Sequence, residues 1–482
     1  MGMRPVNIEA YQLLHQGSIA LSKVEANGIR VDTDYLNKAL KETGEEIERL
    51  NNNLKKDKIY ETWRKRFGER TKIDSNQQLG EVLFNVMGYP CVDKTDKGKP
   101  KTDEEALEKV DLQFVTDYLQ AKKLKKARGT YLTGIRRETV HGFLHPVFNL
   151  HFAQTYRGSC DSPNFQNMPI RRYEIAKLIR QCFIPRKPTN HIIESDYSGV
   201  EVHGAYWYHQ DPVMFEYLSD KTKDMHRDMA QACFMLPNKQ MIPTDKKDAK
   251  RIKKIRYCGK NMFVFPQFYG DWFYSCGPSL WNAMESHELK LRSGTTVREW
   301  LKHKGIRSQG SVKLIQNNKG KWVYPPTKPG TFIDHIKKVE SNFWNKKFKV
   351  YKQWKDEWYA EYLENGGFTT LTGFYIDGPM KRNEVLNYPV QGVAFHCLLW
   401  SLIRLTKLFH KYKMKSLIIG QIHDSIVGDV PRKERKDYLE LSKQVMTVDL
   451  KKHWPFVNSP LEVEAEVAPA GKSWFEKEVV EI

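Results

Sequence analysis

Two apolar segments, far apart in the chain, each lead into an aspartate, and this pairing most limits how the chain can fold. Ile192 to Asp196 has the pattern of a buried strand that ends in a carboxylate. Ser416 to Val430 has the pattern of strand, turn and strand around His423 and Asp424. A lone aspartate of this kind is more often a turn or capping residue. Two of them brought together from separate strands would suit Mg²⁺, which prefers oxygen ligands.

The chain is strongly basic. Its 482 residues include 78 Lys or Arg against 58 Asp or Glu, which gives a net charge of +20. Such an excess favours a polyanionic partner through phosphate neutralisation, although a generic soluble basic protein could have the same balance. The 12 Trp, 23 Tyr and 23 Phe residues add weight to a nucleic acid, because aromatic faces stack on unpaired bases.

Cysteine usage and apolar runs exclude several other classes. The seven cysteines form no CxxC pair and no Cys/His cluster, which indicates neither a zinc site nor a disulfide framework. The N-terminus lacks the apolar core of a signal sequence, and apolar stretches such as Leu398 to Leu402 are too short to cross a bilayer. We therefore expect a cytoplasmic protein without a membrane partner.

A basic helical segment has the features of a phosphate site. Arg256 and Lys260 are four residues apart and share one helix face. A second basic helix opening at Asp224 could add a donor, and Phe263 to Tyr269 supplies an aromatic platform directly afterwards. A solvated basic helix is the ordinary interpretation, but cations beside aromatic rings are what a nucleotide site requires.

Helical patterns and loops alternate along the rest of the chain. Thr116 to Arg128 carries five Lys or Arg residues in a helical setting, a surface for the DNA backbone or an ordinary solvated face. The other segments are helices at 13–50, 333–364 and 390–409, a solvated helical hairpin at 51–70, a basic loop at 94–103, an irregular insertion at 285–330 and a strand hairpin at 368–376.

Nine motifs, in order along nearly the whole chain, resemble those of family A DNA polymerases, the DNA polymerase I type. TYRGSCDSPNFQNMPIR (155–171) resembles the family's TGRLSSSDPNLQNIPIR, and DYSGVEVH (196–203) is similar to motif A, DYSQIELR. The segment 256–270 resembles motif B, NYPVQGVAFH (387–396) the NxPxQGTAAD helix, and QIHDS (421–425) motif C, QVHDE. The remaining matches lie at 24–32, 75–90, 178–185 and 461–474.

The resemblance implies an α+β right-hand polymerase fold, with an antiparallel palm sheet and helical fingers and thumb. It divides the chain into an N-terminal extension (1–19), a thumb (20–140), a palm (141–215 and 371–482) and fingers (216–370) with an insertion at about 285–330. It also implies template-directed DNA synthesis, in which a primer 3′-hydroxyl attacks the α-phosphorus of a dNTP and releases pyrophosphate. The implied partners are primer-template DNA, dNTPs and two Mg²⁺ ions, with Mn²⁺ as a possible substitute.

The resemblance assigns roles by position. Asp196 and Asp424 would bind the metal ions, together with the carbonyl of Tyr197. Glu201 would be the steric gate that crowds a ribose 2′-hydroxyl. The triphosphate and base would be held by His226, Arg256, Lys260, Phe265 and Tyr269. The primer terminus and minor groove would be contacted by Arg157, Gln391 and His423, supported by Asn164, Gln166 and Asn387.

Three positions depart from the family pattern. Ser425 stands where the family has glutamate, so metal binding would rest on the two aspartates. Motif B is one residue longer than usual and contains Pro266, which predicts a helical bulge that places Phe265, and not Val264, at the stacking position. Asn383 stands where the family often has arginine.

These departures keep two alternatives open. The HDS sequence also resembles motif C of single-subunit phage RNA polymerases, so RNA synthesis is one alternative, and a catalytically silent nucleic-acid-binding protein is another. The gate glutamate and the thumb motifs favour a DNA polymerase. Because only about 20 residues precede the thumb match, we expect proofreading to come from a separate exonuclease. The compact form and phrases such as VFPQFYGDWF are most like bacteriophage replicative enzymes.

Overall fold

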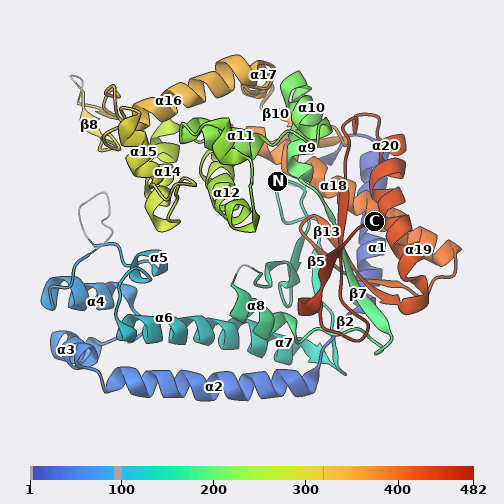
Figure 1. The fold of residues 1–482 in the computed structure, drawn as a ribbon. Coiled ribbons are helices and arrows are strands. Elements are labelled where there is room, and N and C mark those ends of the chain that lie inside the picture. Colours follow the sequence, from blue (N-terminus) through green and yellow to red (C-terminus); the bar gives the residue numbers. More distant parts are fainter. Residues whose placement is uncertain (1–3, 92–99, 171, 318–319) are drawn as a thin grey trace.

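A five-stranded antiparallel sheet carries the strands that were expected to hold the two aspartates (Figure 1). The computed structural model describes residues 4–91, 100–170, 172–317 and 320–482. In spatial order the strands are β12 (Leu417–Ile422), β13 (Ser425–Pro431), β7 (Asn190–Tyr197), β14 (Val463–Val467) and β15 (Glu478–Val480). Within β7 Asp196 alone is exposed, because both faces of this central strand are covered.

Helices cover the sheet, and the longest of them is apolar along most of its length. These helices are α1 (Ile8–Asn27), α9 (Val200–His209), α18 (Arg382–Lys411), α19 (Arg435–Lys443) and α20 (Leu450–His453). Among the described residues, α18 is the one helix long and apolar enough to cross a membrane, but most of its apolar window is buried inside the fold, as in a core helix. It was expected at 390–409 and begins eight residues earlier, with Pro389 inside it.

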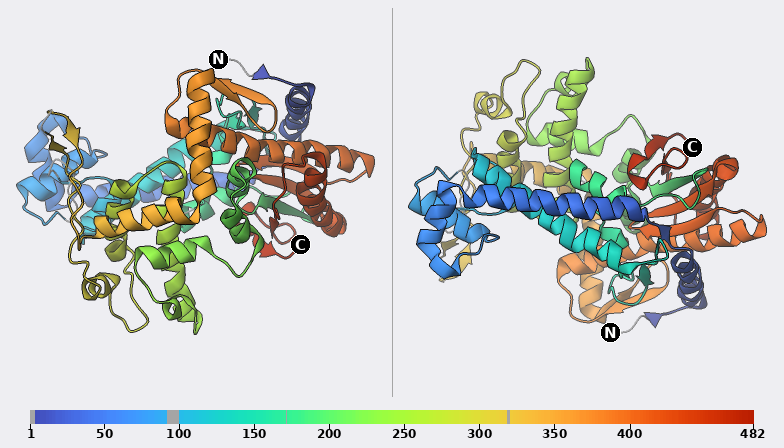
Figure 2. Two further views of the ribbon diagram at one scale, coloured as in Figure 1. Left: turned by 90° about the horizontal axis from the view of Figure 1, so that it is seen from above. Right: turned by 90° about the horizontal axis from the view of Figure 1, so that it is seen from below.

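Two long helices form an arm below the sheet in Figure 1. α2 (Thr33–Lys55) and α6 (Gln113–Lys126) lie side by side, as the view from below in Figure 2 also shows. Asp32 caps α2 by accepting a hydrogen bond from the Tyr35 amide at 2.9 Å. The arm continues through α3 (Lys58–Phe67), α4 (Asn76–Gly80), α5 (Glu104–Leu107) and α7 (Thr133–Glu138), and its base is closed by β2 (Ile29–Arg30), β3 (Thr139–Val140) and β4 (Phe143–Leu144).

The helical hairpin expected at 51–70 is present, but it is not solvated throughout. Trp63 of α3 is fully buried and packs against Tyr118 of α6, with ring centroids 6.1 Å apart. Leu54 and Ile59 join the same cluster. A small hydrophobic core therefore forms at the tip of the arm, in a segment whose composition is basic. Most of the basic loop expected at 94–103 lies outside the described residues.

A second helical layer lies above the sheet in Figure 1. Its helices are α10 (Pro212–Ser219), α11 (Met225–Cys233), α12 (Lys246–Gly259), α13 (Phe265–Phe268), α14 (Phe273–Ser286), α15 (Val297–His303), α16 (Phe332–Asn342) and α17 (Lys349–Asn365). The segment 285–330 was expected to be irregular, yet it contains α15, which a capping box between Thr296 and Glu299 begins. It also contains the short pair β8 (Ile315–Gln316) and β9 (Trp322–Val323).

Two of the expected domain boundaries do not coincide with structural ones. α1 runs across the boundary at 19/20 and packs against α18, where Gly17 meets Leu399 so closely that a Cβ would lie 2.9 Å from Leu399 Cδ2. The N-terminal helix therefore belongs with the sheet and not with the arm. The boundary at 370/371 cuts the hairpin of β10 (Gly367–Thr369) and β11 (Phe374–Asp377), to which β1 (Arg4–Pro5) adds a third strand.

An aromatic cluster fixes the C-terminal segment against the sheet. Trp474 is almost completely buried, stacks on Phe165 with centroids 5.1 Å apart, and meets Phe183 edge-on. The guanidinium of Arg180, in α8 (Tyr173–Arg180), lies 3.9 Å from the Trp474 ring centroid. The hairpin of β5 (Val147–Asn149) and β6 (Ser159–Asp161) leads into this cluster.

We expect Trp474→Ala to lower the free energy of unfolding by about 3–5 kcal/mol, because the change removes a large buried ring and leaves a cavity. Trp474→Phe should cost less, since it keeps part of the packing. Trp322→Ala, a matched change at an exposed tryptophan, should leave stability within about 0.5 kcal/mol of the wild type. Chemical denaturation followed by circular dichroism measures the stability of all three variants. Equal losses of stability in Trp474→Ala and Trp322→Ala would contradict a structural role for the buried Trp474 ring.

Candidate active site

Strand pairing brings the two aspartates together. In the antiparallel register of β7 with β13, Asp196 lies opposite Ser425, the residue directly after Asp424. Asp424 itself occupies the two-residue turn between β12 and β13, and its carbonyl accepts a hydrogen bond from the Tyr197 amide at 3.3 Å. His423, the first turn residue, has a φ of 51°, which a tight hairpin requires. Both expected carboxylates thus stand at one end of adjacent strands.

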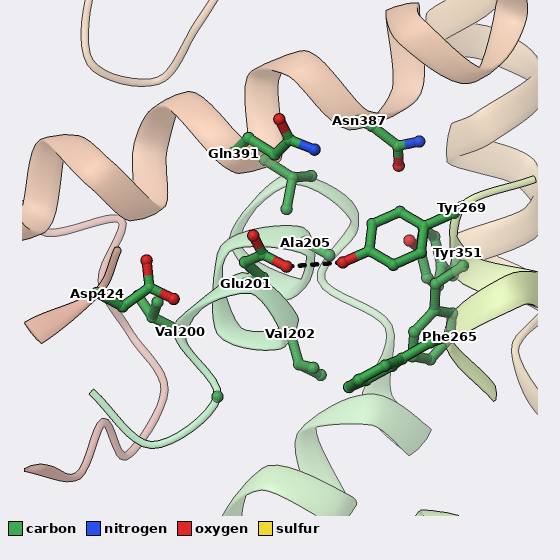
Figure 3. A pocket seen from close by; sticks show the side chains of 13 residues that line it. Val200, Glu201, Val202, Ala205, Phe265, Tyr269, Tyr351, Asn387, Gln391 and Asp424 are labelled. Atoms are coloured by element: carbon green, nitrogen blue, oxygen red, sulfur yellow. Dashed lines mark hydrogen bonds between the residues drawn. The ribbon is translucent and has the colours of Figure 1, made fainter. Parts of the chain in front are cut away.

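A pocket of about 210 Å³ opens beside Asp424 (Figure 3). It collects side chains from the sheet turn, from α9, from the α13 region and from α18. Six of the expected site residues line it: Glu201, Phe265, Tyr269, Asn387, Gln391 and Asp424. In Figure 3 the two amides of α18 lie on one side, Asp424 on another, and the rings of Phe265 and Tyr269 face them.

Glu201 is held in place inside this pocket. Its Oε2 accepts a hydrogen bond from the Tyr269 hydroxyl at 2.7 Å (Figure 3), and its Oε1 lies 4.0 Å from Arg157 Nη1. Burial, and then the neighbouring Glu201 charge, raise the pKa of Tyr269 well above its usual value, so the phenol stays protonated and donates. Arg157, expected near the primer end, therefore lies between Glu201 and Asp424.

The protein alone stabilises the two aspartate anions poorly. Although Asp196 is the most open residue of β7, the protein packed around its carboxylate partly removes it from water and raises its pKa to about 7, and repulsion from Asp424 adds to the rise. Desolvation also raises the pKa of Asp424 to about 6, although Arg157, whose Nη2 lies 3.8 Å from Asp424 Oδ1, opposes it. A divalent cation would supply the missing positive charge. The donor set of carboxylate oxygens fits Mg²⁺.

Tyr197 can offer only its backbone to such a cation. Its side chain is buried and its hydroxyl lies 2.9 Å from Ser401 Oγ on α18. Ser425 is also buried, and its hydroxyl donates toward Glu194 Oε1 and the Ile422 carbonyl, both at 3.0 Å. The serine that replaces the family's glutamate is therefore engaged within the sheet.

The helix before the pocket contains the expected bulge. α12 passes into a π-helical turn at Lys260–Val264, in which the Phe265 amide donates to the Lys260 carbonyl five residues earlier. Pro266 has no amide hydrogen, so a regular turn would lose a hydrogen bond here. As a result Phe265 lines the pocket and Val264 is fully buried, and the stacking role of Phe265 stays a prediction.

Three basic residues gather behind Phe265. Lys260 Nζ lies 4.9 Å from the Phe265 ring centroid, and the ring of His226 meets Phe265 edge-on at 5.5 Å. Arg256 Nε donates to Asp224 Oδ2 at 2.5 Å. Burial lowers the pKa of His226 to about 4, and the charges of Arg256 and Lys260 lower it further, so the imidazole is neutral at pH 7. Its Nδ1 is buried without a hydrogen-bond partner in the described structure.

The remaining expected DNA contacts lie on the other side of the aspartates. Gln166 and His423 line a groove of about 720 Å³, together with Lys122, Lys123 and Lys126 of α6. Gln166 Nε2 donates to Gln421 Oε1 at 2.6 Å, and Gln421 Nε2 donates to the His423 carbonyl at 2.7 Å, which joins the groove to the turn that bears Asp424. Asn164 lines neither space and caps a short 3₁₀ helix instead.

Comparisons with known proteins agree with this geometry. The family model described as DNA polymerase family A matches residues 34–258 and 341–476. The chain belongs to DNA polymerase family A. It is 26% identical over 474 residues to DNA polymerase I of Bacillus subtilis (strain 168), covering 95% of this chain and 45% of that protein. With the thermostable DNA polymerase I of Thermus aquaticus it shares 25% identity, over 95% of this chain and 47% of that one.

A solved structure supports the same fold. The POL domain of Pol1 from M. smegmatis, in complex with DNA primer-template and dNTP, superposes with a TM-score of 0.68 at 21% identity, covering 96% of this chain and 70% of that one. The expected right-hand polymerase fold of the α+β class is thereby confirmed. The chain spans less than half the length of the two curated relatives named above. The family match leaves out residues 259–340, a wider interval than the expected insertion.

Sequence reasoning missed several residues that shape this family A site. Glu194, two residues before Asp196, is largely buried and accepts hydrogen bonds from Ser425, Trp474 and Lys477. Burial raises its pKa, but the ion pair with Lys477 outweighs this and holds the pKa below the usual value. Tyr351 of α17 lines the pocket floor and stacks on His209 at 3.9 Å. The sequence offered one signal for these residues: Glu194 is two positions before Asp196 on a strand, so both side chains point to the same face.

The raised pKa of Asp196 predicts a pH-dependent stability. An unfolded aspartate titrates near pH 3.9 and the folded one near pH 7, so the native chain binds the extra proton between these values and loses stability as pH rises through them. In metal-free buffer we expect Asp196→Asn to melt several degrees above the wild type at pH 8 and at the same temperature near pH 4. Mg²⁺ at pH 8 should raise the Tm of the wild type and leave the Tm of Asp196→Asn unchanged.

Differential scanning fluorimetry across this pH range, with EDTA or with Mg²⁺, measures the effect. Asp437→Asn, which also removes one carboxylate from an exposed position on α19, is the matched control. Parallel Tm curves for the wild type and Asp196→Asn would contradict the desolvation of this carboxylate.

Proposed function

We propose that the chain is a DNA-directed DNA polymerase that extends a primer 3′-hydroxyl with dNTPs and releases pyrophosphate. The observation that carries this proposal is the pocket in which Asp424, Glu201, Phe265 and Tyr269 converge from separate elements. Asp196 and Asp424, with the carbonyl of Tyr197, would hold the metal ions. Bound Mg²⁺ would make the primer hydroxyl a better nucleophile and neutralise charge on the triphosphate.

The chain's own residues bind and orient the substrates. Arg256, Lys260 and neutral His226 would hold the triphosphate, because Lys260 and His226 contact the Phe265 ring and Arg256 lies close enough for its charge to act on both. Phe265 would stack on the incoming base. Glu201 would block a 2′-hydroxyl at the sugar. Asn387 and Gln391 would face the new base pair from α18, and the groove with Lys122, Lys123 and Lys126 would hold the duplex by its phosphates.

The fixed position of Glu201 supports DNA synthesis over the RNA polymerase alternative, since a carboxylate beside the nucleotide sugar disfavours a ribose. The paired carboxylates with raised pKa values support catalysis over a silent nucleic-acid-binding role. A bacteriophage origin, a cytoplasmic location, proofreading by a separate exonuclease and other replication partners stay predictions.

We expect Asp196→Asn and Asp424→Asn each to reduce primer extension by at least about 10³-fold, because each removes one charge from the metal site. Binding of primer-template should persist, since the groove beside α6 is unchanged. Ser425→Ala should retain most activity, because its hydroxyl is engaged with Glu194. Extension of a labelled primer with Mg²⁺ and dNTPs gives the rates, and near wild-type turnover in either asparagine variant would refute the proposal.

We expect Glu201→Ala to raise rNTP incorporation relative to dNTP by about 10- to 100-fold, because the side chain that excludes the 2′-hydroxyl is gone. Tyr269→Phe is the matched control: it removes the hydrogen bond to Glu201 but keeps the carboxylate and the ring. The ratio of rNTP to dNTP incorporation by Tyr269→Phe should lie between the ratios of the wild type and of Glu201→Ala. Single-nucleotide incorporation kinetics measure the ratio, and a wild type that prefers rNTPs would favour the RNA polymerase alternative.

A further inference from the structure

Three aromatic side chains are exposed in the segment that follows the pocket residue Tyr269 along the chain. Trp322 is 65% exposed, Trp272 42% and Tyr324 39%. Tyr324 stacks on Tyr274 with centroids 4.4 Å apart, and Trp272 meets Tyr324 edge-on at 5.2 Å. In β9 and the residue after it, Trp322 and Tyr324 are exposed while Val323 between them is half-buried, as strand alternation requires. We call Trp272, Trp322 and Tyr324 the aromatic shelf.

The surroundings of the shelf are basic. Residues 311–330 contain four lysines and no acidic residue. Lys313, Lys321 and Lys328 are exposed and form no ion pair within the part of the chain that the structure describes. Two acidic residues lie next to the shelf residues or to this segment. Asp271 Oδ1 accepts a hydrogen bond from the Trp272 amide at 3.1 Å. Asp334 accepts one from the Thr327 hydroxyl at 2.8 Å and is paired with Lys338 at 2.7 Å. Flat rings beside uncompensated lysines match a ligand with bases and phosphates, namely a single-stranded nucleic acid.

The position of Trp272 relative to the pocket indicates which nucleic-acid strand the shelf would bind. Trp272 follows Tyr269 by three residues, so at most about 10 Å of extended chain separates it from the pocket. If the pocket holds the forming base pair, the template beyond it is unpaired, because its partner nucleotides have not been added. This strand must leave the pocket over adjoining surface, to which Trp272 and its contact Tyr324 belong.

Resting on the proposed polymerase function, we propose that the aromatic shelf binds the unpaired 5′ part of the template strand ahead of the pocket. The rings stack on successive bases, and Lys321 and Lys313 face the backbone phosphates. Asp271 repels phosphate, so the backbone passes on the lysine side. The shelf lies within residues 259–340, which the family A model leaves unmatched.

The experiment compares two primer-templates that differ only in the unpaired template, with one or with eight nucleotides beyond the primer end. We expect the wild type to bind the longer one about tenfold more tightly by fluorescence anisotropy, and the double variant Trp322→Ala/Tyr324→Ala to lose this preference. The double variant Trp322→Phe/Tyr324→Phe should keep it. Iodouracil placed in the unpaired template should crosslink to the shelf on irradiation.

The shorter template serves as the internal control. All variants should bind and extend it like the wild type, because its duplex and pocket contacts are unchanged. Tyr412→Ala, at an exposed ring directly after α18, should not alter the preference. Equal affinities of the wild type for both templates, or an unchanged preference in the alanine variant, would overturn this inference. If the protein still binds and extends the shorter template when either of these results is obtained, the shelf proposal fails but the proposed polymerase function is unaffected.

Discussion

The antiparallel pairing of β7 with β13 is the constraint on which the site depends. It sets Asp196 opposite Ser425 and so fixes the distance of one carboxylate from the other. A slip of one residue would turn every side chain of β7 to the opposite face. Glu194 lies on the same face of β7, two residues before Asp196, and accepts hydrogen bonds from Trp474 and Lys477 of the C-terminal segment. These contacts help to fix the strand that carries Asp196.

The nucleotide side of the site depends on a second local irregularity. The π turn at Lys260–Val264 adds one residue to the helix, and this rotates Phe265 into the pocket while Lys260 remains over its ring. A regular helix would have presented Val264 instead. The bulge therefore joins a basic face, which suits phosphates, to an aromatic face, which suits a base, within one turn.

Much of this arrangement followed from the sequence. Apolar runs that end at Asp196 and Asp424 predicted the strands, because burial of the backbone leaves the terminal carboxylate as the polar group. Pro266 predicted the bulge, since its missing amide hydrogen has a definite local cost. What escaped prediction depends on tertiary contacts. Trp63 lies in a basic segment whose composition suggested solvent, but Tyr118, distant in sequence, covers it.

The N-terminal helix shows the same effect. α1 crosses the boundary predicted at 19/20, because its placement depends on the contact of Gly17 with Leu399, which no local pattern encodes. Tyr351 entered the pocket from α17 for the same reason: its ring fills the space under α9, beside His209.

The hydrogen bond from Tyr269 to Glu201 has a consequence for how a substrate is selected. A free glutamate side chain on a helix surface samples many rotamers, and fixing it when a ligand arrives would subtract entropy from the binding free energy. Here the phenol has already confined the carboxylate. The ordering cost is therefore included in folding. If Glu201 is the sugar gate that we propose, an incoming sugar would meet a rigid side chain, and a correct and an incorrect sugar would differ by the full contact energy with it.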